Sequence, residues 1–217
     1  MKQQQGFTLV EIAIVLVIIG LLIGGLLKGQ ELIASAKVRN TISQMEELKT
    51  AVFAFQDRFK AMPGDMANAN ALVGAAAVNC TWACGNGLIQ PWRNTSLVTN
   101  HLSAAGFYGG NTNTAESNAA PTAQNAPANP FGGPMFVAYW NQYNATAGGQ
   151  PSVHGVYTGG AIPSKVLAEI DRKIDDGLPQ TGSFRSAWPT ATTAGCVAGN
   201  AWVIDNGRGD CAAAQLF

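Results

Sequence analysis

The stretch that decides the fold is FTLVEIAIVLVIIGLLIGGLL at residues 7–27, which carries a single charge, at Glu11. A helix of about 20 apolar residues spans the hydrocarbon core of a bilayer, which is about 30 Å thick. The main alternative, a removable secretory signal, has a shorter apolar region of about 7–15 residues followed by a small-residue cleavage site. Here the run is longer and ends in LLKGQE at residues 26–31, which offers no such site. We therefore expect the segment to stay attached to the protein.

Glu11 is unusual inside an apolar run. A charged side chain at the centre of a membrane helix costs about 2.5–3.5 kcal/mol on insertion scales. We therefore expect the Glu11 carboxylate to be protonated, paired or close to the lipid headgroups. Its position, five residues after Gly6, agrees with a place at the headgroups, but that interpretation gives no role to the Gly6-Phe7 step.

The motif GFTLVE at residues 6–11 follows a short leader containing Lys2 and precedes the apolar run. In this it resembles the processing and anchoring segment of type IV pilins and type II secretion pseudopilins, over residues 1–62 and in general layout beyond. The resemblance implies that a prepilin peptidase cleaves between Gly6 and Phe7 and methylates the new amine of Phe7. It also implies that Glu11 pairs with the N-terminal amine of a neighbouring subunit in a helical filament, since a low-dielectric filament core penalises either charge alone.

The segment departs from major pilins at one position. Major pilins commonly have a proline where this chain has Lys28, and without it the helix lacks a built-in break. The spacing of Gly20, Gly24, Gly25 and Gly29 suits close approach of a second helix, or is the ordinary glycine content of a membrane helix. The missing proline favours a minor pilin or a pseudopilin over a major pilin.

An amphipathic pattern continues the helix into water. The apolar residues recur every 3.5 residues on average, with most charges off the stripe, and they are Val38, Ile42, Met45, Leu48, Val52, Phe55 and Phe59. The pattern predicts a helix that stops at Met62-Pro63. A coiled coil has the same period, but large aromatic residues suit a sheet face better, and the resemblance also implies an antiparallel sheet against this helix.

The remaining signals predict an α+β head. We expect a helix at 96–105 with Ser96 as its cap and Gly106 as its stop, and a helix at 162–175 stopped by Gly177. Strands are expected at 134–141, 153–158 and, last, 200–205. Residues 109–130 predict an exposed loop, with a linker between two small domains as the alternative. The predicted organisation is a cleaved leader at 1–6, a membrane and assembly helix at 7–28, its amphipathic continuation at 29–62 and a head at 63–217.

Four cysteines follow the membrane segment and permit three pairings. Because the export side of a bacterial inner membrane is oxidising, disulfides are favoured over thiols. We favour Cys80 with Cys84 and Cys196 with Cys211, since each pair closes a local loop; the second resembles the disulfide-bounded loop of many pilins. A four-cysteine zinc site is the alternative, although the spacings differ from those of zinc sites.

Two acidic clusters are candidate cation sites. Asp171, Asp175 and Asp176 lie near one helix end, and Asp205 and Asp210 flank a turn. Calcium takes 6–8 oxygen ligands from such groups, and the resemblance adds that some pseudopilins hold calcium in the head. The alternative is a solvated helix end and a simple turn.

Charge and motifs exclude several classes of protein. The chain has 13 basic and 13 acidic side chains, and residues 66–164 carry only Arg93 and Glu116. A neutral chain is a poor candidate for binding nucleic acid through bulk charge. No hydrolase, P-loop or Rossmann motif is present, and we expect His101 and His154 to be structural.

These observations predict a structural subunit rather than an enzyme. We expect a type IV pilus-like filament subunit, with a type II secretion pseudopilin, or a minor pilin acting as an adhesion or DNA-binding module, as alternatives. The expected partners are further copies of the chain, a prepilin peptidase and the assembly machinery of the inner membrane. The precursor would sit in the bacterial inner membrane with its head in the periplasm, and the mature subunit in a periplasmic or extracellular filament.

Overall fold

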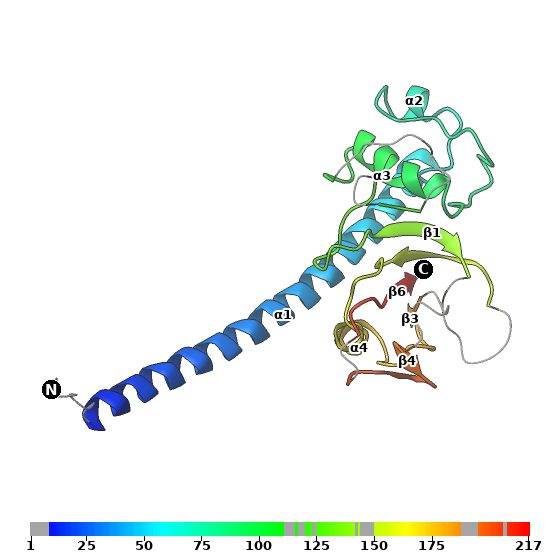
Figure 1. Ribbon diagram of the computed structural model, residues 1–217. Helices are drawn as coiled ribbons and strands as arrows, with labels where there is room; N and C mark the ends of the chain where they lie inside the picture. Colours follow the sequence, from blue (N-terminus) through cyan, green and yellow to red (C-terminus); the bar gives the residue numbers. More distant parts are fainter. Residues whose placement is uncertain are drawn as a thin grey trace. The chain divides into compact units, whose positions relative to one another are not determined.

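The computed structural model describes residues 9–110, 116, 120–122, 125–141, 143, 150–187, 195–205 and 208–217. The chain divides into two compact units, Met1–Lys37 and Val38–Phe217. Helix α1, Leu9–Phe59, is the first element and belongs to both (Figure 1).

In the first unit, α1 exposes its apolar side chains instead of packing them. Leu9 is 90% exposed, Leu21 73% and Leu26 63%. By length and composition, α1 is apolar enough to cross a membrane. No described residue covers this part of α1, so its apolar surface is open to lipid or to another chain.

In the second unit, α1 buries most of the predicted stripe, and Ile42 and Phe59 are partly buried. Its buried residues are Val38, Thr41, Met45, Leu48, Ala51, Val52 and Phe55. The predicted end of the helix at Met62 is wrong, because α1 ends at Phe59. Lys60 adopts a φ of 54°, and its N–H still donates to the Gln56 carbonyl at 2.8 Å. A left-handed residue of this kind ends a helix before Pro63 can.

Four strands form the main sheet: β1 (Phe136–Trp140), β2 (Val153–Tyr157), β3 (Phe184–Ser186) and β6 (Ala213–Leu216). Their order is β1-β2-β6-β3, and every pair is antiparallel. The register places Phe136 opposite Tyr157 and Val156 opposite Gln215. A separate hairpin joins β4 (Val197–Ala198) to β5 (Ala201–Trp202).

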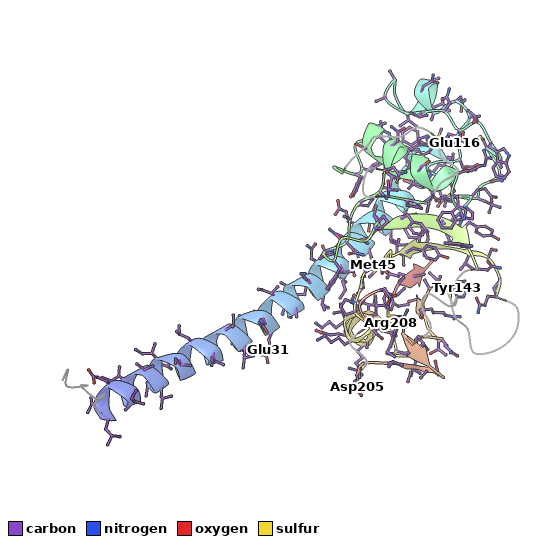
Figure 2. The ribbon with its side chains drawn as sticks, in the orientation of Figure 1. Glu31, Met45, Glu116, Tyr143, Asp205 and Arg208 are labelled. Carbon is purple, nitrogen blue, oxygen red and sulfur yellow. A yellow bond between two sulfur atoms is a disulfide. The ribbon has the colours of Figure 1, made fainter. Side chains whose placement is uncertain are left out.

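The two faces of the main sheet have different neighbours, because side chains alternate along a strand. Val137, Val156 and Phe184 share one core with Met45 and Phe55 of α1. Figure 2 shows Met45 where α1 meets the head. The opposite face carries a second cluster, in which the rings of Phe136 and Tyr157 stack at 5.1 Å. A long helix on a small antiparallel sheet confirms the predicted α+β architecture.

Three shorter helices complete the head: α2 (Ala69–Leu72), which the sequence did not predict, α3 (Asn94–Ala104) and α4 (Ser164–Ile174). Ser96 is not the cap of α3, because the helix begins at Asn94. The Ser96 hydroxyl instead donates to the Arg93 carbonyl at 2.9 Å, from inside the first turn. Gly106 (φ 78°) and Gly177 (φ 80°) follow α3 and α4 as predicted.

Two other expectations differ from the structure. The expected last strand at 200–205 contains only β5, and the last strand is β6, whose sequence AAQL lacks the β-branched and aromatic residues typical of strands. Within the expected loop at 109–130, residues 111–115, 117–119 and 123–124 lie outside the described residues. Its end is buried rather than exposed: Asn129 is 3% exposed, and its amide donates to the Thr158 carbonyl at 2.7 Å.

Candidate functional site

The candidate site is the N-terminal part of α1. Glu11 lies in its first turn, where the partial positive charge of a helix N-terminus favours a carboxylate. The predicted processing residues, Gly6 and Phe7, lie outside the described residues. Of the two predicted assembly residues, Phe7 and Glu11, the structure therefore describes Glu11 alone.

The glycines of this helix are not needed by its own fold. A Cβ added at Gly20, Gly24, Gly25 or Gly29 would meet no atom within 4 Å. By contrast, a Cβ at Gly64 would lie 2.5 Å from the Asn94 carbonyl oxygen. The small positions of α1 are thus open surface, on which another helix can approach closely.

Residues 1–27 match the family model described as the prokaryotic N-terminal methylation motif. The chain carries a prepilin-type signal. This signal marks a precursor of the type IV pilin and pseudopilin type. Neither the curated proteins nor the solved structures include a match to the chain.

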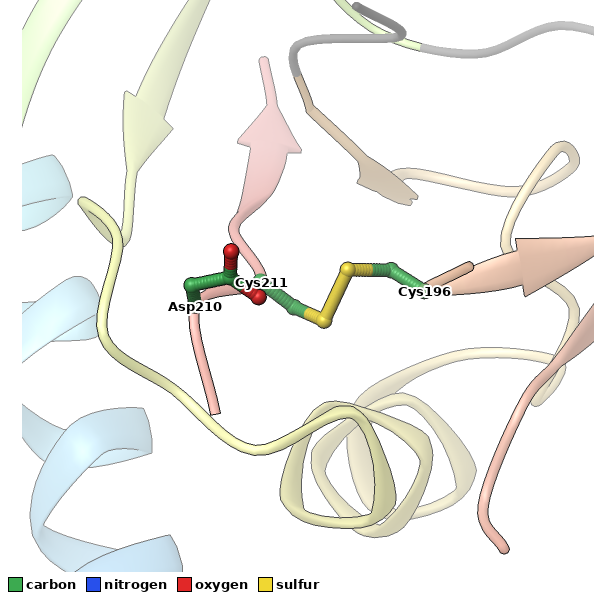
Figure 3. A group of neighbouring side chains, drawn as sticks. All are labelled: Cys196, Asp210 and Cys211. Carbon is green, nitrogen blue, oxygen red and sulfur yellow. A yellow bond between two sulfur atoms is a disulfide. The ribbon is translucent and has the colours of Figure 1, made fainter. Parts of the chain in front are cut away.

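The prepilin-type signal covers the leader and the exposed apolar part of α1, and the cysteines belong to the head. The structure joins Cys80 to Cys84 and Cys196 to Cys211, the pairing favoured from the sequence. Figure 3 shows the second bond, with Asp210 beside Cys211. Because each sulfur is bonded to another sulfur, none is a thiolate that could hold zinc.

The second disulfide connects two parts of the sheet region. Cys196 directly precedes β4, and Cys211 precedes β6. Cys211 also exchanges both backbone hydrogen bonds with Ile162, at 3.0 and 3.2 Å. The pair therefore fastens the β4–β5 hairpin and the start of α4 to the strand that lies inside the main sheet.

Asp171 is the buried member of the first acidic cluster. Its side chain is fully buried, and its two oxygens accept from the Trp202 Nε1–H at 2.7 Å and the Gly177 N–H at 3.0 Å. Burial raises the pKa of Asp171 to about 6, although both hydrogen bonds oppose this shift. The carboxyl group thus joins the end of α4 to β5.

The other two carboxylates also have protein donors. Asp175 accepts from the Phe184 N–H at 2.7 Å, and Asp176 from the Leu178 N–H at 2.9 Å. One oxygen from each of Asp171, Asp175 and Asp176 lies within 4.8 Å of the others. Carboxylate oxygens are suitable ligands for a hard cation. Here, however, they already accept hydrogen bonds from N–H groups, which leaves fewer lone pairs for a metal ion. Calcium binding at this cluster stays a prediction.

The second predicted acidic pair has a different environment. Asp205 is exposed at the periphery of the head (Figure 2). Asp210 accepts from Arg208 Nε at 2.6 Å and Nη2 at 2.9 Å. This bond lowers the pKa of Asp210. Asn206 and Gly207, between them, lie outside the described residues.

His101 is fully buried, which agrees with the structural role expected for it. Its Nδ1 accepts from the Gly64 N–H at 2.9 Å, so Nε2 carries the proton and donates to the Val78 carbonyl at 2.7 Å. Burial lowers the pKa of His101. The neutral ring therefore fixes the turn that follows α1.

Asp65 is an anchor that the sequence analysis missed. It is 2% exposed, and its oxygens accept from the Gly85 and Gly87 N–H groups at 2.8 and 2.7 Å. Burial raises the pKa of Asp65 against these bonds. The sequence feature that could have predicted this role is the position of Asp65, a single carboxylate directly after the Pro63-Gly64 pair.

Proposed function

We propose that the chain is a structural subunit of a type IV pilus-like filament. A prepilin peptidase would cleave it between Gly6 and Phe7 and methylate Phe7, and the N-terminal helix would carry assembly. One observation carries this proposal: the prepilin-type signal at 1–27 includes the first part of α1, a helix whose apolar side chains are not covered by any described residue there.

The exposed helix supports a mechanism of assembly by helix packing. In a membrane, lipid already shields apolar side chains, so association relies on close van der Waals contact at small residues. Gly20, Gly24 and Gly25 offer such contact, since no described atom lies within 4 Å of a Cβ added at these positions. Glu11 would then supply the register by pairing with the amine of Phe7 in a neighbouring copy.

A type II secretion pseudopilin is the second candidate. Lys28 stands where major pilins commonly have proline, and α1 runs without interruption from Leu9 to Phe59. Under either proposal the precursor lies in the inner membrane, the head enters the periplasm, and the subunit meets the inner-membrane assembly machinery. The signal is that of structural proteins that are generally not enzymes, and we propose no catalytic activity.

The processing step is tested by mass spectrometry of the mature protein from its host. We expect a chain that begins at Phe7 and carries one additional methyl group. A chain that still contains residues 1–6, in cells with an active prepilin peptidase, would contradict the proposal.

The register step is tested by Glu11→Ala, with Glu31→Ala as the control. Glu31 is another carboxylate of α1, but it is exposed and paired with Lys28 at 2.8 Å. We expect Glu11→Ala to reduce filament yield at least about tenfold, because a buried amine is then unpaired, and Glu31→Ala to assemble normally. Filaments of Glu11→Ala at the wild-type level would refute the role of Glu11.

A further inference from the structure

Two charged side chains of α1 have no partner in the described structure. Arg39 and Glu46 are both exposed, and neither makes an ion pair, a hydrogen bond or a ring contact with any described residue. Every other basic side chain of α1 has such a contact; for example, Lys28 pairs with Glu31, and Arg58 lies over the Phe59 ring. Arg39 is therefore the one basic side chain of α1 without a partner in the described structure, and Glu46, like its neighbour Glu47, has no paired cation there.

The spacing of these two residues explains why they do not pair within one chain. Side chains on a helix reach each other over three or four residues, whereas Arg39 and Glu46 are seven apart, or about 10.5 Å along the axis. Lys49 is three residues from Glu46, but its Nζ is directed at the Phe217 ring, 5.6 Å from the centroid. Seven residues make nearly two full turns, so both charges point to the same side of α1.

Glu46 lines an open groove together with a second carboxylate, Glu47. The groove has a volume of about 470 Å³ and is lined by Ser43, Glu46, Glu47, Thr50, Ala51, Ala54 and Phe107. Two carboxylates would meet a guanidinium, while alanine methyl groups and an aromatic ring would cover the aliphatic stem. In the described structure no cation is paired with either glutamate.

We propose that Arg39 of one copy occupies the Glu46 groove of the next copy, with the two α1 helices parallel and shifted by seven residues. A shift of two turns brings every Arg39 to a Glu46, and the contact repeats along the filament. Phe53 lies a further seven residues along α1 and is 45% exposed. The same shift therefore brings the aliphatic part of Glu46 in the first copy to Phe53 of the next copy. This inference rests on the proposed filament, and it adds a second register in the aqueous part of α1.

Cysteine cross-linking of the full chain in its host tests the shift directly. All four native cysteines are in disulfides, so engineered thiols have no free native thiol to join. In Arg39→Cys/Glu46→Cys filaments, oxidation should link each copy to the next and give a ladder of dimers, trimers and higher species. The matched pair Arg39→Cys/Phe53→Cys, which requires a shift of fourteen residues, and each single variant should give no ladder.

Charge exchange supplies the second measurement. Arg39→Glu and Glu46→Arg should each reduce filament yield at least about tenfold, since like charges then meet. The double variant Arg39→Glu/Glu46→Arg should restore the yield. Wild-type yield in both single variants, or a ladder from the 39/53 pair in place of the 39/46 pair, overturns this register and leaves the filament proposal intact. A wild-type chain that forms no filament overturns the proposed function instead.

Discussion

The burial of Asp171 makes the stability of the head fall as pH rises, which is the opposite of the usual effect of an aspartate. Asp171 has a pKa of about 6 in the folded protein, against 3.8 for an ordinary aspartate. Between these values the folded state holds a proton that the unfolded state has lost, so the free energy of unfolding falls as pH rises. Since one pKa unit corresponds to about 1.36 kcal/mol, the full loss is about 3 kcal/mol and is complete near pH 7.

Asp171→Asn isolates this contribution, because an amide does not titrate. We expect the free energy of unfolding of the wild type, minus that of Asp171→Asn, to fall by about 2 kcal/mol between pH 4 and pH 7, because an unfolded aspartate is already mostly ionised at pH 4. Urea unfolding of the full chain in detergent, followed by tryptophan fluorescence, measures both proteins in the presence of a chelator. Asp57→Asn is the control, because Asp57 is exposed and its ion pair in the described structure is with Lys60 of the same helix end. A difference between wild type and Asp171→Asn that stays constant over this range would refute the reasoning.

Two further predictions concern the head. Cys196→Ser/Cys211→Ser should lower the free energy of unfolding by about 3 kcal/mol, and Cys80→Ser/Cys84→Ser by about 2 kcal/mol. The first loss is larger because that disulfide closes a loop of 15 residues and the other a loop of 4. Equal losses, measured by urea unfolding, would contradict the loop-length argument. If Asp171, Asp175 and Asp176 hold calcium, a concentration 100 times the Kd should stabilise the head by about 2.7 kcal/mol over chelator, and Asp176→Asn should abolish the gain. A melting temperature that is identical in calcium and in chelator removes the calcium hypothesis.

Local patterns were sufficient for much of the fold. The 3.5-residue stripe from Val38 to Phe59 predicted the buried side of α1, although Ile42 and Phe59 are only partly buried, because helical periodicity depends only on neighbours in sequence. Gly106 and Gly177 follow their helices as predicted, since the left-handed conformation that ends a helix is cheap for glycine. Short-range disulfide pairing followed from the same kind of local argument.

Long-range contacts account for the errors. Strand β6 was missed because Ala213 and Ala214 have little strand propensity of their own, and only pairing with β2 and β3 on either side makes this segment a strand. Asp65 and His101 were not recognised as anchors of specific turns, because their partners lie 20 or more residues away. The residues next to Asp65 or His101 in the sequence do not indicate which distant residues they will contact.

The sequence alone determined that this chain has a prepilin-type start, a membrane-length helix and an amphipathic continuation, because each depends on residues adjacent in the chain. Tertiary structure decided which carboxylates are buried, which strand lies inside the sheet and which charges of α1 have no ion-pair partner in the described structure. Arg39 and Glu46 show the difference. Their sequence spacing is visible at once, but only the folded head shows that Lys49, the cation three residues from Glu46, lies over the Phe217 ring instead.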